Sequence, residues 1–278
     1  MTALIKRTAV GTLCMAIGAH SLAAQIDFYN TDAGRPIRIE DAYSIERRGL
    51  ELQATPLRLE RGKRGQYRWG IEPAIEYGVL PRTQLEVGFP LAWRDYGLPG
   101  RRSGLAGIDV SVLHNLNVET RLPALAIVAD VLLPVGNLAS KTTYSSVTGI
   151  ATKSLGWGRI HVNGQYTFGD APAVSATTAS TSTGVVGGQV LEISRWLGGV
   201  AVDHTFPLRS TLITAEVYAQ DGLADASTVT WNSTIGTRYQ VSPRWAFDGG
   251  IGRRLTGPEQ AWSITVGGAY ALGLPWRR

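Results

Sequence analysis

Hydrophobic and polar residues alternate with a period of two along most of the chain after residue 50. Between residues 67 and 77 the odd positions carry Trp69, Ile71 and Tyr77, whereas the even positions carry charged or small residues. Successive side chains of a β-strand point to opposite faces, so one face of this segment is apolar with aromatic ends and the other is polar. The same division recurs along the chain to residue 272. The pattern predicts a large antiparallel β-sheet with one apolar and one polar face.

We expect twelve strands, most of them about 8 to 14 residues long, and a tilted strand needs ~9–11 residues to cross a bilayer. Short turns and longer loops alternate between the strands. This asymmetry is typical of an all-β transmembrane barrel of a bacterial outer membrane, with short periplasmic turns and longer external loops. The predicted strands are 50–57, 67–77, 84–94, 105–118, 124–135, 142–154, 159–168, 192–205, 211–220, 227–240, 245–254 and 261–272.

Aromatic residues of the apolar face fall at both ends of the predicted strands. A soluble β-sandwich or a propeller is the alternative fold, but such folds rarely place aromatic residues at both ends of an exposed face. Two aromatic girdles at the membrane interfaces explain the placement. The predicted girdle residues are Trp69, Trp93, Trp196, Trp231 and Trp262 at the long-loop ends, and Tyr77, Tyr239, Trp245 and Tyr270 at the short-turn ends.

The polar face of the predicted barrel is the candidate functional surface. Charges of both signs lie on it, and they either line an aqueous path that selects solutes or pair across a narrow lumen and fill it. Mixed signs favour pairing over a wide general pore. The predicted lumen-lining residues are Arg68, Glu72, Glu76, Glu86, Arg94, Asp109, Asp130, Arg159, His161, Arg195, Asp203, Glu216, Arg238, Asp248 and Arg254.

The first 24 residues have the features of a cleaved signal peptide. Two positive charges, Lys6 and Arg7, precede an apolar run, and small residues follow up to Ala24. This order predicts export, and the apolar run is too short for a membrane helix. Residues 25–49 are polar, and we expect them to form either a loose periplasmic segment or a plug inside the lumen. Residues 50–278 then form the barrel.

Composition limits the possible chemistry. The net charge is +5, and it falls to +3 without Lys6 and Arg7, which is too little to indicate a nucleic-acid partner. The single cysteine, Cys14, lies in the predicted signal peptide, so we expect no disulfide in the mature chain. The four histidines show no metal-ligand spacing, and we expect neither a metal nor another cofactor.

Four segments carry a resemblance to a known family. They are residues 35–43 (RPIRIEDAY), 70–78 (GIEPAIEYG), 80–91 (LPRTQLEVGFPL) and 132–136 (LLPVG). Together they resemble the outer-membrane family named for the meta-pathway of phenol degradation, most strongly over residues 35–136. The resemblance implies an exported barrel, distantly related to transporters of fatty acids and aromatic hydrocarbons. These motifs are strand ends and turns and contain no catalytic residue.

An enzyme is the alternative that the polar face leaves open. Outer-membrane phospholipases are also twelve-stranded barrels and use a Ser–His pair, and His161 is the candidate base in this chain. No serine adjoins His161, and its position predicts a side chain in the lumen, away from lipid. We therefore predict no enzymatic activity.

We predict a passive outer-membrane channel of a Gram-negative bacterium for small, hydrophobic or aromatic compounds. A lipid-modifying hydrolase and a structural surface barrel are the alternatives. The predicted partners are outer-membrane lipid, lipopolysaccharide and a small-molecule solute, and the oligomeric state stays open. The lipopolysaccharide contact is expected from basic external loops, whose residues are Arg58, Arg61, Lys63 and Arg64 in one and Arg101 and Arg102 in another.

Overall fold

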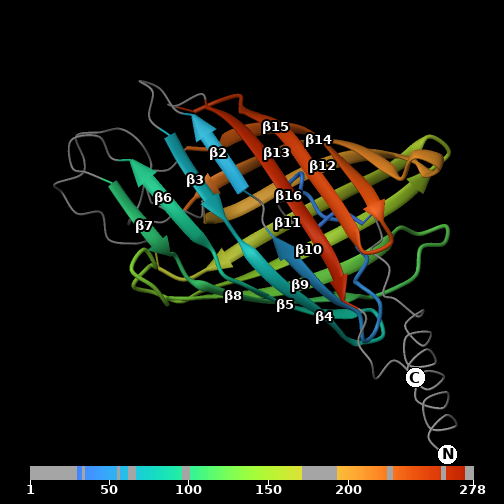
Figure 1. Cartoon of the computed structure of the whole chain (residues 1–278), viewed down its shortest axis with the longest axis horizontal. Helices are drawn as coiled ribbons and strands as arrows, with labels where there is room; N and C mark the ends of the chain where they lie inside the picture. Colours follow the sequence, from blue (N-terminus) through green and yellow to red (C-terminus); the bar gives the residue numbers. More distant parts are fainter. Residues whose placement is uncertain are drawn as a thin grey trace, which may run out of the picture.

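The chain forms a closed antiparallel β-barrel, as the alternating pattern predicts (Figure 1). The computed structural model describes residues 30–32, 35–54, 57–61, 67–95, 101–170, 193–223, 228–257 and 261–272. Within these residues all strand segments belong to one sheet, and the pairing of the first segment with the last closes it. The predicted signal peptide lies outside the described residues. No helix among the described residues is long and apolar enough to cross a membrane.

Twelve strands build the described wall, and the first four are each divided into two segments. The divided strands are β1 (Leu50–Ala54) with β2 (Leu57–Arg61), β3 (Tyr67–Ile71) with β4 (Pro73–Leu80), β5 (Thr83–Gly88) with β6 (Leu91–Asp95), and β7 (Arg101–Leu105) with β8 (Ile108–Asn115). The continuous strands are β9 (Ala124–Leu133), β10 (Tyr144–Leu155), β11 (Gly158–Phe168), β12 (Ser194–Phe206), β13 (Thr211–Gly222), β14 (Thr230–Ser242), β15 (Trp245–Arg254) and β16 (Trp262–Leu272).

The divisions have local causes. In the third strand Pro90 separates β5 from β6, and a proline cannot donate a ladder hydrogen bond. In the first strand Gln53 lies opposite Ala269 and Leu57 lies opposite Val266. The first strand therefore contains one residue more than its partner β16 over this stretch, which is a β-bulge and exchanges the two faces of the strand.

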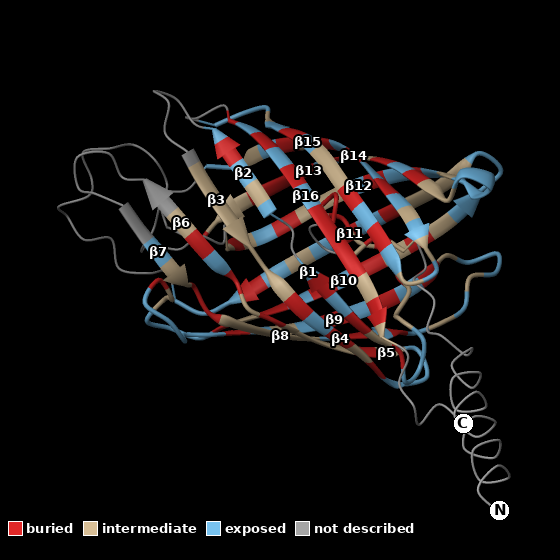
Figure 2. Ribbon diagram, in the orientation of Figure 1, coloured by how far each residue is buried: buried red, intermediate tan, exposed pale blue. Residues whose placement is uncertain are grey.

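The two faces of the wall differ as expected for a barrel in lipid. Along β9, Leu125 and Ile127 are exposed on the outside, whereas Ala124, Ala126 and Val128 are buried inside. Figure 2 shows this alternation of exposed and buried positions along the continuous strands. The exposed apolar side chains form the surface that faces hydrocarbon.

The wall is incomplete as a strand ladder beside β7. One edge of β7 pairs with β6, and among the described residues no strand pairs with its other edge. The segment after β9 covers this edge instead. The Leu138 N–H donates to the Leu105 carbonyl at 3.0 Å, and the Asn137 Nδ2 donates to the Ser103 carbonyl at 3.1 Å. A loop, not a ladder, closes the wall at this place.

Candidate functional site

The segment before the first strand lies inside the barrel (Figure 1). We call residues 30–49 the plug, of which residues 33–34 lie outside the described residues. Arg35, Ile37, Ile39 and Ala42 of the plug are all at most 1% exposed. The alternative of a loose periplasmic segment does not agree with this burial.

Side chains of the wall accept and donate the hydrogen bonds of the plug backbone. Glu216 on β13 is the clearest case, because its Oε2 accepts both the Arg38 N–H at 2.7 Å and the Ile39 N–H at 2.9 Å. A buried backbone N–H without a partner costs free energy, and the plug forms no sheet ladder over residues 36–49. Glu216 therefore replaces the ladder for two successive residues.

Other strands continue this pattern along the plug. Thr152 on β10 accepts the Ala42 N–H at 3.0 Å, and the Asn115 amide on β8 donates to the Ala42 carbonyl at 2.7 Å. Gln84 on β5 accepts the Ile45 N–H at 2.9 Å. The plug thus crosses the inner wall and is held at each step by a polar side chain of a different strand.

Glycines of the wall make room for two apolar plug residues. A Cβ built on Gly236 would lie 2.5 Å from Cγ of Pro36. A Cβ on Gly199 would lie 2.6 Å from Cδ1 of Ile39, whose side chain packs with Ile37, Leu197 and Tyr218 in a buried cluster whose fifth member is Ala201. The absence of a side chain at these two positions allows the plug to touch the wall.

A buried charge network joins the plug to strands β11 and β12. The Arg159 guanidinium donates to Asp41 of the plug at 3.2 Å and to both carboxylate oxygens of Asp203, at 3.1 and 2.6 Å. His161 lies 2.9 Å from Asp203 through Nε2 and 3.0 Å from the Thr152 hydroxyl through Nδ1. A carboxylate only accepts, so Nε2 of His161 carries the proton.

A second network holds the start of the plug. Arg238 on β14 donates to Asp32 at 3.0 Å and lies 3.7 Å from Glu51 of β1. Arg35 also pairs with Asp32, and it lies 3.4 Å from Glu51. The positive charges of two guanidinium groups are therefore balanced by the negative charges of two carboxylates inside the buried lumen.

His161 does not form an accessible catalytic pair. Thr152, His161 and Asp203 do lie in a hydroxyl–imidazole–carboxylate row, which is the arrangement that nucleophilic catalysis uses. However, Thr152 and His161 are both 0% exposed, and the Thr152 oxygen already accepts the Ala42 N–H. The row therefore supports the plug and offers no nucleophile to lipid.

The plug also contacts the turn between β8 and β9 at the short-turn end. The Tyr43 hydroxyl donates to Glu119 at 3.2 Å, and burial beside Glu119 raises the pKa of Tyr43 to about 12. Burial alone would raise the pKa of Glu119, but hydrogen bonds from the Ser154 hydroxyl and N–H and from Lys153 lower the pKa to about 2. The plug leaves the lumen beside this ionised carboxylate.

Four carboxylates on one side of the lumen are only half-buried. Glu72 lies between β3 and β4, and Glu86, Asp109 and Asp130 lie on β5, β8 and β9. We call them the carboxylate strip. Wall residues under the plug, such as His161, are fully buried. The plug therefore covers one side of the lumen and leaves the carboxylate strip partly open.

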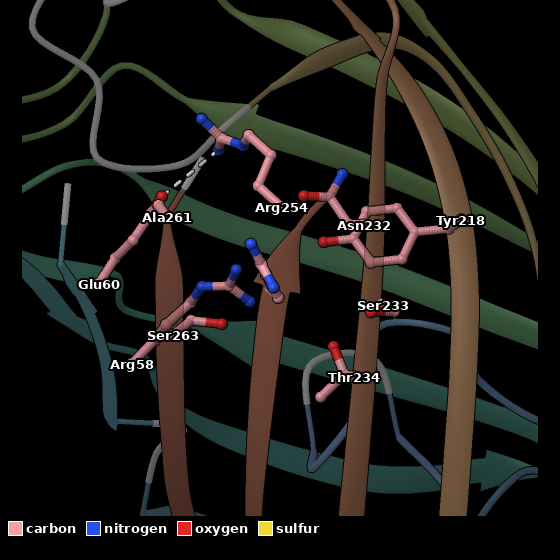
Figure 3. A pocket seen from close by; sticks show the side chains of 10 residues that line it. Arg58, Glu60, Tyr218, Asn232, Ser233, Thr234, Arg254, Ala261 and Ser263 are labelled. Carbon is pink, nitrogen blue, oxygen red and sulfur yellow. Dashed lines mark ion pairs between the residues drawn. The ribbon is translucent and has the colours of Figure 1, made fainter. Parts of the chain in front are cut away.

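A second polar region lies nearer the long-loop end, and we call it the arginine pocket (Figure 3). The Arg254 guanidinium lies 3.5 Å from Glu60, and Arg68 lies 3.2 Å from the same carboxylate. Arg58, Tyr218 and Asn232 also line the region, and Arg58 adds a third positive charge. Arg253 lines it too, with its guanidinium over the Trp262 ring. Positive charges therefore outnumber negative charges in the arginine pocket, whereas the carboxylate strip is negatively charged.

Most predicted lumen residues have polar contacts or buried positions on the inner wall, but two need separate comment. The side chain of Arg94 lies outside the described residues. A bulge between Ser194 and Trp196 changes the alternation of β12. Ser194, not Arg195, continues the inner face and bonds Gln220 at 3.2 Å. Arg195 donates to the carbonyls of Thr167 and Gly169 at the long-loop end, in place of the predicted lumen position.

The predicted girdle residues lie on the outer face at the two ends of the barrel. Trp69 and Trp93 stack with their ring centroids 6.2 Å apart, and the ring centroids of Trp245 and Tyr270 are 4.5 Å apart. Trp196, Trp231, Tyr239 and Trp262 are between 36% and 54% exposed, whereas Tyr77 is half-buried.

Arg58 and Glu60 of the arginine pocket were missed by sequence reasoning. The pattern ended the first strand at Leu57 and placed Arg58 and Arg61 in a basic loop, whereas both lie in β2. Arg101 and Arg102 likewise lie in β7, not in a loop. The signal was present, because Leu57 and Leu59 alternate with Arg58 and Glu60. The bulge before β2 exchanged the faces and hid the continuation.

Comparisons with known proteins agree with this architecture. No family model matches the chain, and no curated protein matches its sequence. Among solved structures, an outer membrane channel from Pseudomonas putida F1 is similar with a TM-score of 0.59 and 12% identity, over 87% of this chain and 100% of that one. The KdgM porin has a TM-score of 0.50 and 11% identity, over 80% and 99% of the two chains.

The translocator domain of the autotransporter NalP from Neisseria meningitidis has a TM-score of 0.51 and 11% identity, over 80% of this chain and 88% of that one. At such identities the likeness shows the fold alone. The fold is that of an outer-membrane β-barrel.

Proposed function

We propose that the chain is a passive channel of the outer membrane for small solutes. The observation that carries the proposal is the half-buried carboxylate strip beside the plug, because a lumen that only fills itself with paired side chains would bury these carboxylates as it buries His161. The likeness in fold to an outer membrane channel and to a porin supports the same role.

Planar-bilayer recording of the refolded chain tests this function. We expect discrete current steps, smaller than those of a wide general pore because the plug occupies part of the lumen. A second assay follows the swelling of liposomes in small neutral solutes. A refolded barrel that gives neither current nor swelling would be a structural barrel, and the channel proposal would fall.

For apolar or aromatic solutes, the support is the resemblance to the phenol-degradation family together with the loop-closed wall beside β7. A strand ladder cannot open without losing a row of hydrogen bonds, whereas among the described residues the loop holds this edge of β7 through the Asn137–Ser103 and Leu138–Leu105 bonds. We infer that an apolar solute enters the bilayer or the lumen at this place. Uptake of toluene by cells with and without the chain tests the route, and an Asn137→Ala variant should raise the uptake.

We also propose a lipopolysaccharide contact on the outer face, at a position that differs from the predicted loops. Arg61 and Arg253 both lie opposite Trp262 in the strand register, and the Arg253 guanidinium lies 5.0 Å from the Trp262 ring. Two arginines beside a girdle tryptophan at the long-loop end suit phosphates of the outer leaflet. Loss of lipopolysaccharide co-purification in an Arg61→Gln, Arg253→Gln variant would support this contact, and unchanged co-purification would exclude it.

A further inference from the structure

The arginine pocket is the feature of the lumen that the proposed function does not yet use. In it, Glu60 is shared by the guanidinium groups of Arg68 and Arg254, whose side chains are 27% and 13% exposed. Arg58 adds a positive charge from the same face of β2 as Glu60. Three arginines and one carboxylate leave a net positive charge in a partly enclosed space.

The strand register fixes the surroundings of this carboxylate. Arg68 lies directly opposite Glu60 across β2 and β3, and Ser263 of β16 lies opposite Glu60 on its other side. Neither neighbour adds a second carboxylate that would offset the arginines.

Neutral donors lie beside the guanidinium groups. Asn232 on β14 and Tyr218 on β13 face the arginine pocket, and they are 5% and 2% exposed (Figure 3). An arginine fork with nearby amide and hydroxyl groups suits the oxygens of a carboxylate or phosphate, because bidentate N–H···O bonds to these groups are short and strong.

We propose that the arginine pocket binds the oxyanion group, a carboxylate or a phosphate, of a small solute. Arg254 and Arg58 contact the oxyanion, and Glu60 competes with it for the guanidinium groups. The biological use of this site rests on the proposed channel function, but its chemistry does not. Since Tyr218 packs with Ile37 and Ile39, the bound solute would lie directly against the wall that holds the plug.

Calorimetric titration of the refolded chain in detergent tests the site, with benzoate, inorganic phosphate and uncharged benzyl alcohol as probes. We expect both anions to bind at low salt, benzyl alcohol not to bind, and 1 M salt to weaken anion binding. The stronger of the two anions then identifies the group that the site prefers. Absence of anion binding to the wild-type chain would overturn the proposal.

Two variants and one matched control make the test specific. Arg254→Gln should weaken anion binding about tenfold, equivalent to about 1.4 kcal/mol. Arg195→Gln should have no effect, because Arg195 does not line the arginine pocket and donates to the Thr167 and Gly169 carbonyls instead. Glu60→Gln should strengthen binding, since it removes the competing carboxylate. Equal effects of Arg254→Gln and Arg195→Gln, or weaker binding in Glu60→Gln, would overturn the site.

The binding and conduction measurements separate the two proposals. Anion binding without current in planar bilayers would leave the site in place and remove the channel function. Current without anion binding would leave the channel in place and remove the site.

Discussion

Arg159 on β11 holds Asp41 of the plug at 3.2 Å across 118 residues of sequence, and it holds Asp203 on the next strand at 2.6 Å. One guanidinium therefore joins the plug to the wall. Asp41 in turn accepts the backbone N–H groups of Thr31 and Tyr43, each at 3.0 Å. The fold of the plug and its attachment depend on the same carboxylate.

Replacing Arg159 should loosen the plug. Arg159→Gln leaves Asp41 and Asp203 without their cation, and loss of one partner of a buried pair costs about 3–5 kcal/mol. We expect a larger mean single-channel conductance and faster proteolysis of residues 30–49. Arg195→Gln is the control, because Arg195 bonds strand-end carbonyls. Equal conductance in all three proteins would show that Arg159 does not hold the plug.

Crowding the glycine under Pro36 should displace the plug without opening the barrel. A Cβ on Gly236 meets Pro36, whereas a Cβ on the outward Gly164 meets nothing within 4 Å. Gly236→Ala should therefore destabilise the folded state by about 1–3 kcal/mol, and Gly164→Ala should not. Urea unfolding in lipid vesicles measures the difference. If the two variants have the same free energy of unfolding, the contact between Gly236 and Pro36 does not contribute to stability.

Neutralising the carboxylate strip should change ion selectivity. In the double variant Glu86→Gln/Asp130→Asn the cation-to-anion permeability ratio should fall, because carboxylates that line a channel favour the passage of cations. The reversal potential in a salt gradient measures this ratio. Glu46→Gln, at an exposed position of the plug, is the matched control. An unchanged reversal potential would mean that ions pass elsewhere.

Acid should weaken the attachment of the plug at the short-turn end. The pKa of Glu119 is lowered to about 2, from an ordinary value of 4.5. Its stabilising contribution is therefore complete above pH 4.5 and is lost as the pH falls toward 2. The difference in unfolding free energy between wild type and Glu119→Gln, about 1 kcal/mol at this solvated rim, should disappear over that range. A difference that does not depend on pH would contradict the assignment.

The period of two was sufficient for the barrel, because lipid on one side and a polar lumen on the other constrain every strand alike. It failed where a strand shifts by one residue. The bulge after β1 placed Arg58 on the wrong side of a predicted boundary, and the bulge at Arg195 moved that residue off the inner face. In the sequence, one extra residue in a strand interrupts the alternation and looks like the end of that strand.

The plug could be predicted only as one of two alternatives. Residues 30–49 as a whole keep no strand or helix period, since wall side chains such as Glu216 and Thr152 satisfy the plug backbone. Glu216 and Thr152 lie more than 100 residues from the plug residues that they bind. Their pairing follows from barrel closure, not from local sequence. In hindsight the alternation of Ile37 and Ile39 with charged residues was the available signal.

The dependence of the plug on Glu216, Thr152, Asn115 and Gln84 also sets an order of events during biogenesis. These four side chains come from β13, β10, β8 and β5, and they converge only after the sheet has closed on itself. Before closure the segment has nothing to donate to and nothing to accept from except water. The stretch that leaves the ribosome ahead of all the strands is therefore the last to take its native shape.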